Sequence, residues 1–310
     1  IEASEGDAGD VGAVPVSAYT GIGQTETDSN DFNGHGTHVA GIALGRLNGA
    51  YRGVAPDAGL IDMLVGNVAP VEIAVIRALD KCIERRVDWS IRVATLAMDL
   101  GASDNGLSAS AQAVNRVVQA GIVVTCATAN SGPLVEVPPP ASADYAITVA
   151  SAFDNATADR TDDTISSFSS RGPRPDDADL DLTEEFKPDV TAHGESIMSC
   201  DNDSVSGYVL NSGASMAAPH VAGLTALIIQ ANPSMLPLSV KQHIINTAED
   251  RGAPGWDLEW GHGLVNGFAA INDIFGGTTT DLRFDCYMGA PSGDCIGNPW
   301  WFSPDVKPVN

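Results

Sequence analysis

Short apolar runs alternate along the chain with longer segments whose apolar residues recur at helical spacing. The runs with the length and composition of buried strands are 60–65, 89–96, 122–127 and 145–150. The segments with helical periodicity are 35–45, 71–86, 108–120, 215–230 and 237–248. In 71–86, for example, Ile73, Ile76 and Leu79 are expected to face inward. This alternation predicts an α/β fold, a three-layer αβα arrangement with a mostly parallel, doubly wound central sheet.

The remaining segments have the composition of loops. Residues 1–32 are rich in Gly, Ala, Asp and Ser, and we expect loop with one short strand near 13–18. The acidic stretch 174–185 is expected to be a solvated loop. Residues 1–275 are assigned to one domain, and 276–310, with Gly, Pro and two adjacent Trp, to a C-terminal extension.

The excess of acidic over basic side chains limits the classes of function that the chain can have. The 310 residues include 40 acidic and 16 basic side chains, which give a net charge of −24. Nucleic-acid binding requires the opposite sign and is excluded. An Asp-rich, Lys-poor surface repels itself and is screened by salt, so adaptation to high salt is one hypothesis; an acidic secreted enzyme with bound cations is the other.

The apolar runs and the cysteines give little further indication of the function. No apolar run reaches the roughly 18 residues of a membrane span, and no signal peptide begins at Ile1, as expected of a cytoplasmic or an already processed chain. Of the five cysteines, Cys82 and Cys126 lie in apolar patterns and are expected to be buried thiols. Cys286 and Cys295 either form a local disulfide or stay reduced.

The stretch NSGASMAAPHVAGLTALIIQ, residues 211–230, has the strongest chemical character. A Gly-containing approach delivers Ser215 to the start of an apolar helix. Backbone N–H groups at a helix start lack intrahelical partners and favour negative charge, which suits a serine whose reaction generates an oxyanion. A serine that only caps a core helix would have the same pattern.

Three blocks together resemble the subtilisin-like serine proteases (subtilases). These blocks are NGHGTHVAGIALG (33–45), VVTCATANSGP (123–133) and the serine stretch, and the resemblance runs from about residue 30 to about 275. It implies a subtilisin-like fold and a serine endopeptidase that works through an acyl-enzyme. Ser215 would be the nucleophile and His35 the base that takes its proton, with His38 in a structural role. Asn130 and the backbone N–H of Ser215 would stabilise the oxyanion.

The resemblance also implies a substrate site and partners. Asp99, Leu100 and Gly101 match the family's edge that pairs with an extended peptide, and Ala129 would line the adjoining side-chain pocket with Asn130. Asp99 replaces a Ser of the family pattern, so we expect preference for neutral or basic substrate positions. Polypeptide substrates and a propeptide are the implied partners, an extracellular location follows, and membrane partners are excluded. The chemistry uses no cofactor; calcium is implied only as a structural ion, and its site is not placed.

The third member of the family's catalytic triad, an Asp in a DTG block, is not evident. Asp7 is the nearest match, but IEASEG before it is not an apolar strand, and Asp10, Asp28 and Asp31 also lack that context. We expect that the chain begins after the Asp strand; Asp7 and a natural protein without this Asp are the alternatives. Loss of that strand would leave apolar surface and unpaired backbone in the sheet.

Two further substitutions and two rival functions complete the sequence picture. Ala214 and His193 replace a Thr and a Pro of the family pattern. With the missing Asp, Ala214 keeps open an inactive subtilase scaffold that binds peptides without cleaving them. A metalloprotein built on the chain's histidines is the weaker rival, because HGTH lacks the zinc-protease pattern HExxH.

Overall fold

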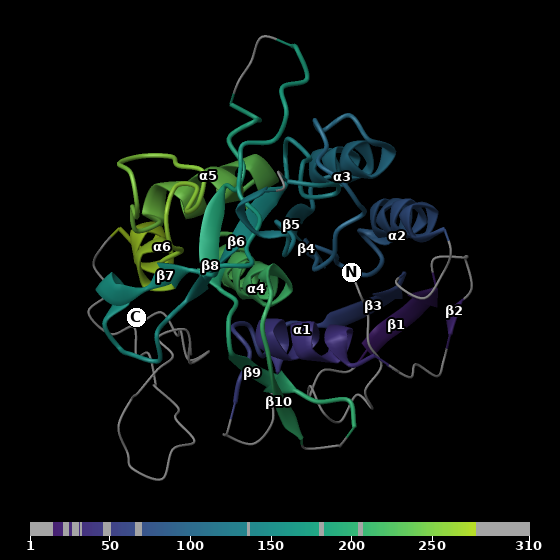
Figure 1. Cartoon of the computed structure of the whole chain (residues 1–310). Helices are drawn as coiled ribbons and strands as arrows, with labels where there is room; N and C mark the ends of the chain where they lie inside the picture. The colour runs from purple at the N-terminus through teal and green to yellow at the C-terminus, as the bar shows by residue number, and fades with distance from the viewer. Residues whose placement is uncertain are drawn as a thin grey trace.

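The computed structural model describes residues 15–20, 25–26, 31, 33–45, 51–65, 70–134, 137–179, 183–203 and 207–276 (Figure 1). The strands are β1 Pro15–Thr20, β2 Thr25–Glu26, β3 Leu60–Leu64, β4 Val93–Leu96, β5 Val123–Ala127, β6 Ile147–Phe153, β7 Thr164–Ile165, β8 Val190–His193, β9 Ile197–Cys200 and β10 Tyr208–Asn211. The helices are α1 His35–Leu44, α2 Val71–Arg85, α3 Ala109–Gln119, α4 Ala214–Ala231, α5 Pro237–Thr247 and α6 Gly267–Ile274.

The predicted three-layer α/β fold is confirmed. The main strands pair in parallel, β4 with β5, β5 with β6 and β6 with β8, and helices cover both faces. Strand β5 shows why four of its five residues are apolar, with Thr125 as the exception. Val123 and Ala127 belong to the core beneath α4, whereas Val124 and Cys126 belong to the core beneath α2 and α3. A strand buried on both faces needs apolar side chains at odd and even positions.

The parallel strands among the described residues lie in two separate sheets rather than in one continuous sheet, and each sheet also has one antiparallel edge strand, β2 or β7. One has the order β2-β1-β3, and the other runs β4-β5-β6-β7 with β8 paired to β6. No hydrogen-bonded pairing joins β3 to β4 within the described strands, although α2 connects them along the chain. A hairpin of β9 and β10 packs beside α1 (Figure 1).

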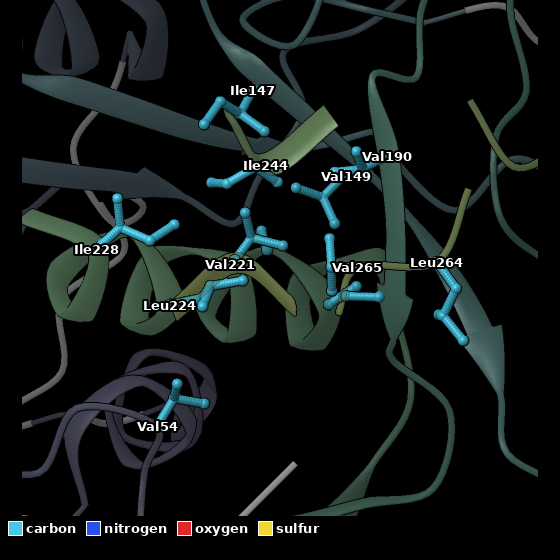
Figure 2. Packing of buried hydrophobic residues seen from close by; sticks show 14 of the residues in the cluster. Val54, Ile147, Val149, Val190, Val221, Leu224, Ile228, Ile244, Leu264 and Val265 are labelled. Carbon is cyan, nitrogen blue, oxygen red and sulfur yellow. The ribbon is translucent and has the colours of Figure 1, made fainter. Parts of the chain in front are cut away.

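Helix α4 is the centre of one of the two main cores (Figure 2). Val221, Leu224 and Ile228 contact the sheet and α5, and Val54, from the segment after α1, packs on the opposite side. By length and composition α4 is also apolar enough to cross a membrane, which corrects the expectation that no segment reaches that threshold. Of its 18 residues 78% are buried, as in the core helix of a globular domain.

The structure corrects several local expectations. Strand β4 begins at Val93 rather than residue 89, because Trp89 and Ile91 donate backbone hydrogen bonds to Arg85 and Arg86 and close the end of α2. Ile73 is 47% exposed: α2 turns its small residues, such as Ala74 and Ala78, to the core instead.

The acidic stretch 174–185 is not wholly solvated. Arg174 is 2% exposed and ion-paired with Asp144, Asp177 and Glu185, so both ends of the stretch are anchored in the interior. Cys82 and Cys126 are buried free thiols as predicted, and burial raises the pKa of Cys126 to about 12. Cys286, Cys295 and the C-terminal extension from 277 lie outside the described residues.

The packing of α4 predicts the cost of a cavity. Leu224 is 1% exposed, so Leu224→Ala should lower the free energy of unfolding by about 2–5 kcal/mol. Leu238→Ala is the matched control, because Leu238 lies in α5 and is 50% exposed; its effect should stay within about 0.5 kcal/mol. Urea unfolding of both variants measures the difference, and equal losses would contradict the central position of α4.

Candidate active site

Ser215 lies in the first turn of α4, as the sequence predicts. It follows Ala214, the first helical residue, and is 9% exposed. Its hydroxyl donates a hydrogen bond of 2.9 Å to the backbone carbonyl of Ala97, directly after β4. The proton of the Ser215 hydroxyl is thus directed at a strand end in this structure and not at an imidazole.

Two glycines allow the chain to reach this helix start. Gly213 donates its N–H to the carbonyl of Gly194 at 2.7 Å. A Cβ added at Gly194 would lie 2.5 Å from Gly213 O and 2.5 Å from the Ser151 hydroxyl. The segment before α4 therefore crosses the segment after β8 at a distance that only glycine permits.

Asn130 is held against the same helix start. It follows β5, is exposed, and its Oδ1 accepts the backbone N–H of Ala214 at 2.7 Å. This bond satisfies one N–H of the first turn of α4 and leaves the Nδ2 group as the donor end of the side chain. The structure therefore brings Asn130 and Ser215 together, as expected of two parts of one site.

Ala129 gives the turn before Asn130 its unusual geometry. Its φ is 84°, in the left-handed region that a residue with a Cβ rarely adopts, and it is 3% exposed. Its carbonyl accepts the N–H of Ser170 at 3.1 Å, and the Ser170 hydroxyl accepts the N–H of Ser131 at 3.2 Å. Such strain costs about 1–3 kcal/mol and persists where the surroundings impose it, as they often do at functional sites.

His35 is the first residue of α1, which packs along α4 (Figure 1). Asp31 fixes this helix start. Its Oδ1 accepts the N–H of Gly34 at 2.8 Å, and its Oδ2 accepts the N–H of Thr37 at 3.0 Å and its hydroxyl at 2.8 Å. Asp31 therefore caps α1 rather than serving as the third triad member. Asp7, Asp10 and Asp28 lie outside the described residues.

Three other histidines are tied into separate structural contacts, which argues against a shared metal site. His38 Nε2 lies 3.1 Å from the carbonyls of both Ile197 and Val209, in the structural role predicted for it. His193 Nε2 is 2.8 Å from Asp163 Oδ2, with both side chains 1% exposed. His220 Nδ1 contacts its own helix, 2.9 Å from the carbonyl of Met216.

The proposed peptide-binding edge follows Ala97 directly. Asp99 is exposed, and the backbone of Leu100 is fixed by donation to the carbonyl of Pro139 at 2.8 Å. Gly101 has a φ of 123°, and no atom lies within 4 Å of the position where its Cβ would be. The backbone at Gly101 is therefore open to an approaching chain.

One cluster of three carboxylates among the described residues has a spacing suited to binding a cation. Oxygens of Asp176, Asp177 and Glu185 lie within 4.8 Å of one another. Carboxylates suit a hard cation such as calcium. Here, however, the Arg174 guanidinium lies 3.3 Å from Glu185 and 3.7 Å from Asp177, so the chain itself supplies a positive charge to the group. The group does not fit a calcium site as it stands, and no step of the chemistry is assigned to a metal.

Comparison with known proteins follows this geometry. The model of the subtilase family matches residues 15–263, and the chain belongs to that family. It is 34% identical over 269 residues to serine protease AprX of Bacillus subtilis, covering 78% of the chain and 58% of AprX. It is 33% identical to subtilisin BL of Lederbergia lenta, covering 79% of the chain and 80% of that protein.

Solved structures show the same fold. Sphericase superposes with a TM-score of 0.71 at 26% identity, covering 86% of this chain and 89% of that one. The S41 psychrophilic protease gives a TM-score of 0.71 at 25% identity, with 85% and 88% covered.

Sequence reasoning missed two features of the site. The Ala97 carbonyl that receives the Ser215 hydroxyl is a backbone group, for which no residue type gives a signal. The buried His193–Asp163 pair joins the end of β8 to the segment before β7 across 30 residues. An unexpected His in an apolar strand, together with an upstream Asp, is the only sequence signal that could have suggested it.

The buried His38 predicts how stability depends on pH. Desolvation lowers its pKa from 6.5 to about 4, so the fold favours the neutral ring. This contribution is fully present above pH 6.5 and is lost as the pH falls toward 4. Relative to His38→Gln, the wild type should lose on the order of 2 kcal/mol between pH 7 and pH 4. Urea unfolding across this range measures it; parallel profiles for the two proteins would contradict it.

Proposed function

We propose that this chain is a serine endopeptidase in which Ser215 is the nucleophile and His35 the general base. The observation that supports this most directly is the convergence at the head of α4. There the Ser215 hydroxyl and the Asn130 side chain lie at one helix start, and the helix that begins at His35 packs alongside. AprX, a similar protein, is named a serine protease.

The reaction requires that the hydrogen bond from the Ser215 hydroxyl to the Ala97 carbonyl break first. A substrate carbonyl carbon is attacked by Ser215 Oγ, and the hydroxyl proton passes to the His35 imidazole. The carbonyl oxygen becomes an oxyanion, which the Nδ2 group of Asn130 and the Ser215 backbone N–H can stabilise at the positive end of α4. The peptide C–N bond then breaks, the proton moves from His35 to the leaving amine, and water releases the acyl group by the reverse sequence.

The substrate would bind as an extended strand along residues 99–101. Backbone pairing places successive side chains on alternate sides, and Ala129 and Asn130 would line the pocket before the cleaved bond. Support comes from the fixed backbone of Leu100 and the open space at Gly101. We also infer an extracellular location, because one similar relative is named a minor extracellular protease.

A fluorophosphonate probe tests the nucleophile directly, because it reacts only with an activated serine. The wild type should be labelled at Ser215 and should hydrolyse casein, and Ser215→Ala should lose both. Ser212→Ala is a control at a neighbouring serine, whose hydroxyl accepts the N–H of Ser196, and should keep both. Absence of labelling in a folded wild type would favour the inactive scaffold.

Removal of the Asn130 donor should lower kcat by about 10²–10³ with little change in KM, because an oxyanion donor acts in the transition state. The substitution is Asn130→Leu, and Asn246→Leu is the control at an exposed helical Asn. Thermal melting of both variants separates this effect from loss of the bond to Ala214. A change in KM alone would assign Asn130 to substrate binding instead.

The exposed carboxylate of Asp99 should disfavour acidic substrate positions. Asp99→Asn should raise cleavage of peptides with Glu near the cut bond by about two- to fivefold, relative to peptides with Gln there. In 1 M salt this difference should nearly vanish, because screening acts on exposed charges. Asp88→Asn, at an exposed Asp outside the proposed site, is the control. A salt-independent preference would exclude Asp99 as its cause.

A further inference from the structure

A buried histidine–aspartate pair lies beside the segment that leads to Ser215. His193 is the last residue of β8, and Asp163 directly precedes β7. His193 Nε2 lies 2.8 Å from Asp163 Oδ2, and both side chains are 1% exposed. The reaction proposed above uses neither side chain. Two polar groups are costly to bury unless each is held against its partner, so the fold fixes the separation of these two residues.

The strand register places the pair on the face of β6 that packs against α4. Ala152 pairs with His193 of β8 on one edge of β6 and with Ile165 of β7 on the other. Paired residues share a face of the sheet, and so do residues two apart in one strand, so Asp163 lies on the same face as Ile165. Ala152 belongs to the core around α4. Its small side chain leaves room for the pair to span β6 on this face.

The end of β8 also holds the approach to Ser215. The carbonyl of Gly194 accepts the N–H of Gly213 at 2.7 Å, two residues before Ser215. The ring of His220, further along α4, contacts the backbone of His193. Residues 193 and 194 therefore contact the chain on both sides of Ser215, so a shift of this segment would shift the nucleophile with it.

The bond between His193 and Asp163 fixes this segment where β8 ends. Residues 194–196 connect β8 to β9, and such a connection is less restrained than a strand. His193 stands where the family pattern has a Pro, whose ring restricts the backbone. Here a buried side-chain bond supplies the restriction.

The reaction is sensitive to this restraint, because a displacement of about 1 Å at a reacting group can cost about 10²-fold in rate. We propose that His193 is a positioning residue that, through its bond to Asp163, fixes the head of α4 and with it the Ser215 hydroxyl. This role rests on the proposed function, in which Ser215 is the nucleophile.

Two variants of the full chain separate positioning from stability. His193→Leu leaves the Asp163 carboxylate buried without its partner, so the Tm should fall. His193→Leu combined with Asp163→Ala removes both polar groups at nearly the same total volume, so the Tm should recover. With a chromogenic peptide substrate, both should show a kcat about 10- to 100-fold below the wild type and little change in KM, because neither restores the bond.

A conservative variant and a matched control complete the set. Asp163→Asn keeps a side chain that can bond to the His193 ring, so it should retain most of the wild-type kcat. Thr191→Val is the control in the same strand, because the buried Thr191 hydroxyl donates to the carbonyl of Trp260 at 3.0 Å, outside the proposed site. It should lower the Tm and leave kcat and KM unchanged.

Three results would overturn the positioning role. The first is an unchanged kcat in His193→Leu. The second is recovery of kcat together with the Tm in the double variant, which would make the pair merely structural. The third is a kcat in Thr191→Val that falls with its Tm. If His193→Leu does not fold, the double variant decides, because it leaves no buried charge; if only the double variant fails to fold, the single variant decides.

Amide hydrogen exchange gives a readout that requires no catalysis. Without the bond, residues 211–216 should exchange about tenfold faster than in the wild type, whereas residues 221–230 of the same helix should keep their rate. Unchanged exchange at 211–216 would also overturn the role. A folded wild type that fluorophosphonate does not label would contradict the proposed function instead, and exchange would then still show whether the pair fixes this segment.

Discussion

The burial of α4 between α1 and the parallel strands is the constraint on which the rest of the structure depends. A helix can lie this close to neighbours on several sides only if its side chains are small where the approach is closest. Ala214, Ala217 and Ala218 are all fully buried. A Cβ on Gly223 would lie 2.6 Å from Val54. The same small residues hold the head of α4 at the ends of β4 and β5, where Ala97 and Asn130 contact it.

The charged residues of the interior are also closely packed. Lys187 is buried beside Asp189, 2.9 Å away, and Lys241 approaches the other oxygen of Asp189 at 2.8 Å. Asp189 also accepts the N–H of Thr148, which ties the bases of β6 and β8 together. Burial lowers the pKa of Lys187 to about 7 despite this carboxylate. In a chain of net charge −24, these two lysines lie where they pair with a buried acid.

The sequence was sufficient for elements whose pattern depends on local spacing. Three such elements are the helix at His35, the strand at Val123 and the helix at Ser215. They could be predicted because burial of a regular element requires apolar residues at a regular spacing. The hairpin of β9 and β10 could not, because its strands are short and one of them is half exposed. Ile73 was assigned to the wrong face, because size and hydrophobicity suggested burial where close packing required Ala74 and Ala78.

The candidate site, too, could be predicted only in part from the sequence. Ser215, His35 and Asn130 are the candidates that the motif blocks indicate through their resemblance to the family, whereas the contact of Ser215 with the Ala97 carbonyl and the capping role of Asp31 depend on backbone geometry that no residue type reveals. The interruption between β3 and β4 concerns strands far apart in the sequence, and it is of the kind expected where the family's Asp strand is missing from the sheet.

That interruption is linked to the site through shared elements. An apolar cavity between β3 and β4 is lined by Gly36, directly after His35, and by Val39 and Ala40 about one turn later; β4 leads from this cavity to Ala97. This cavity thus adjoins both the helix that begins at His35 and the strand that leads to the carbonyl that accepts the Ser215 hydroxyl. The course of β4 and the tilt of α1 against α4 therefore act together on the separation of His35 from Ser215.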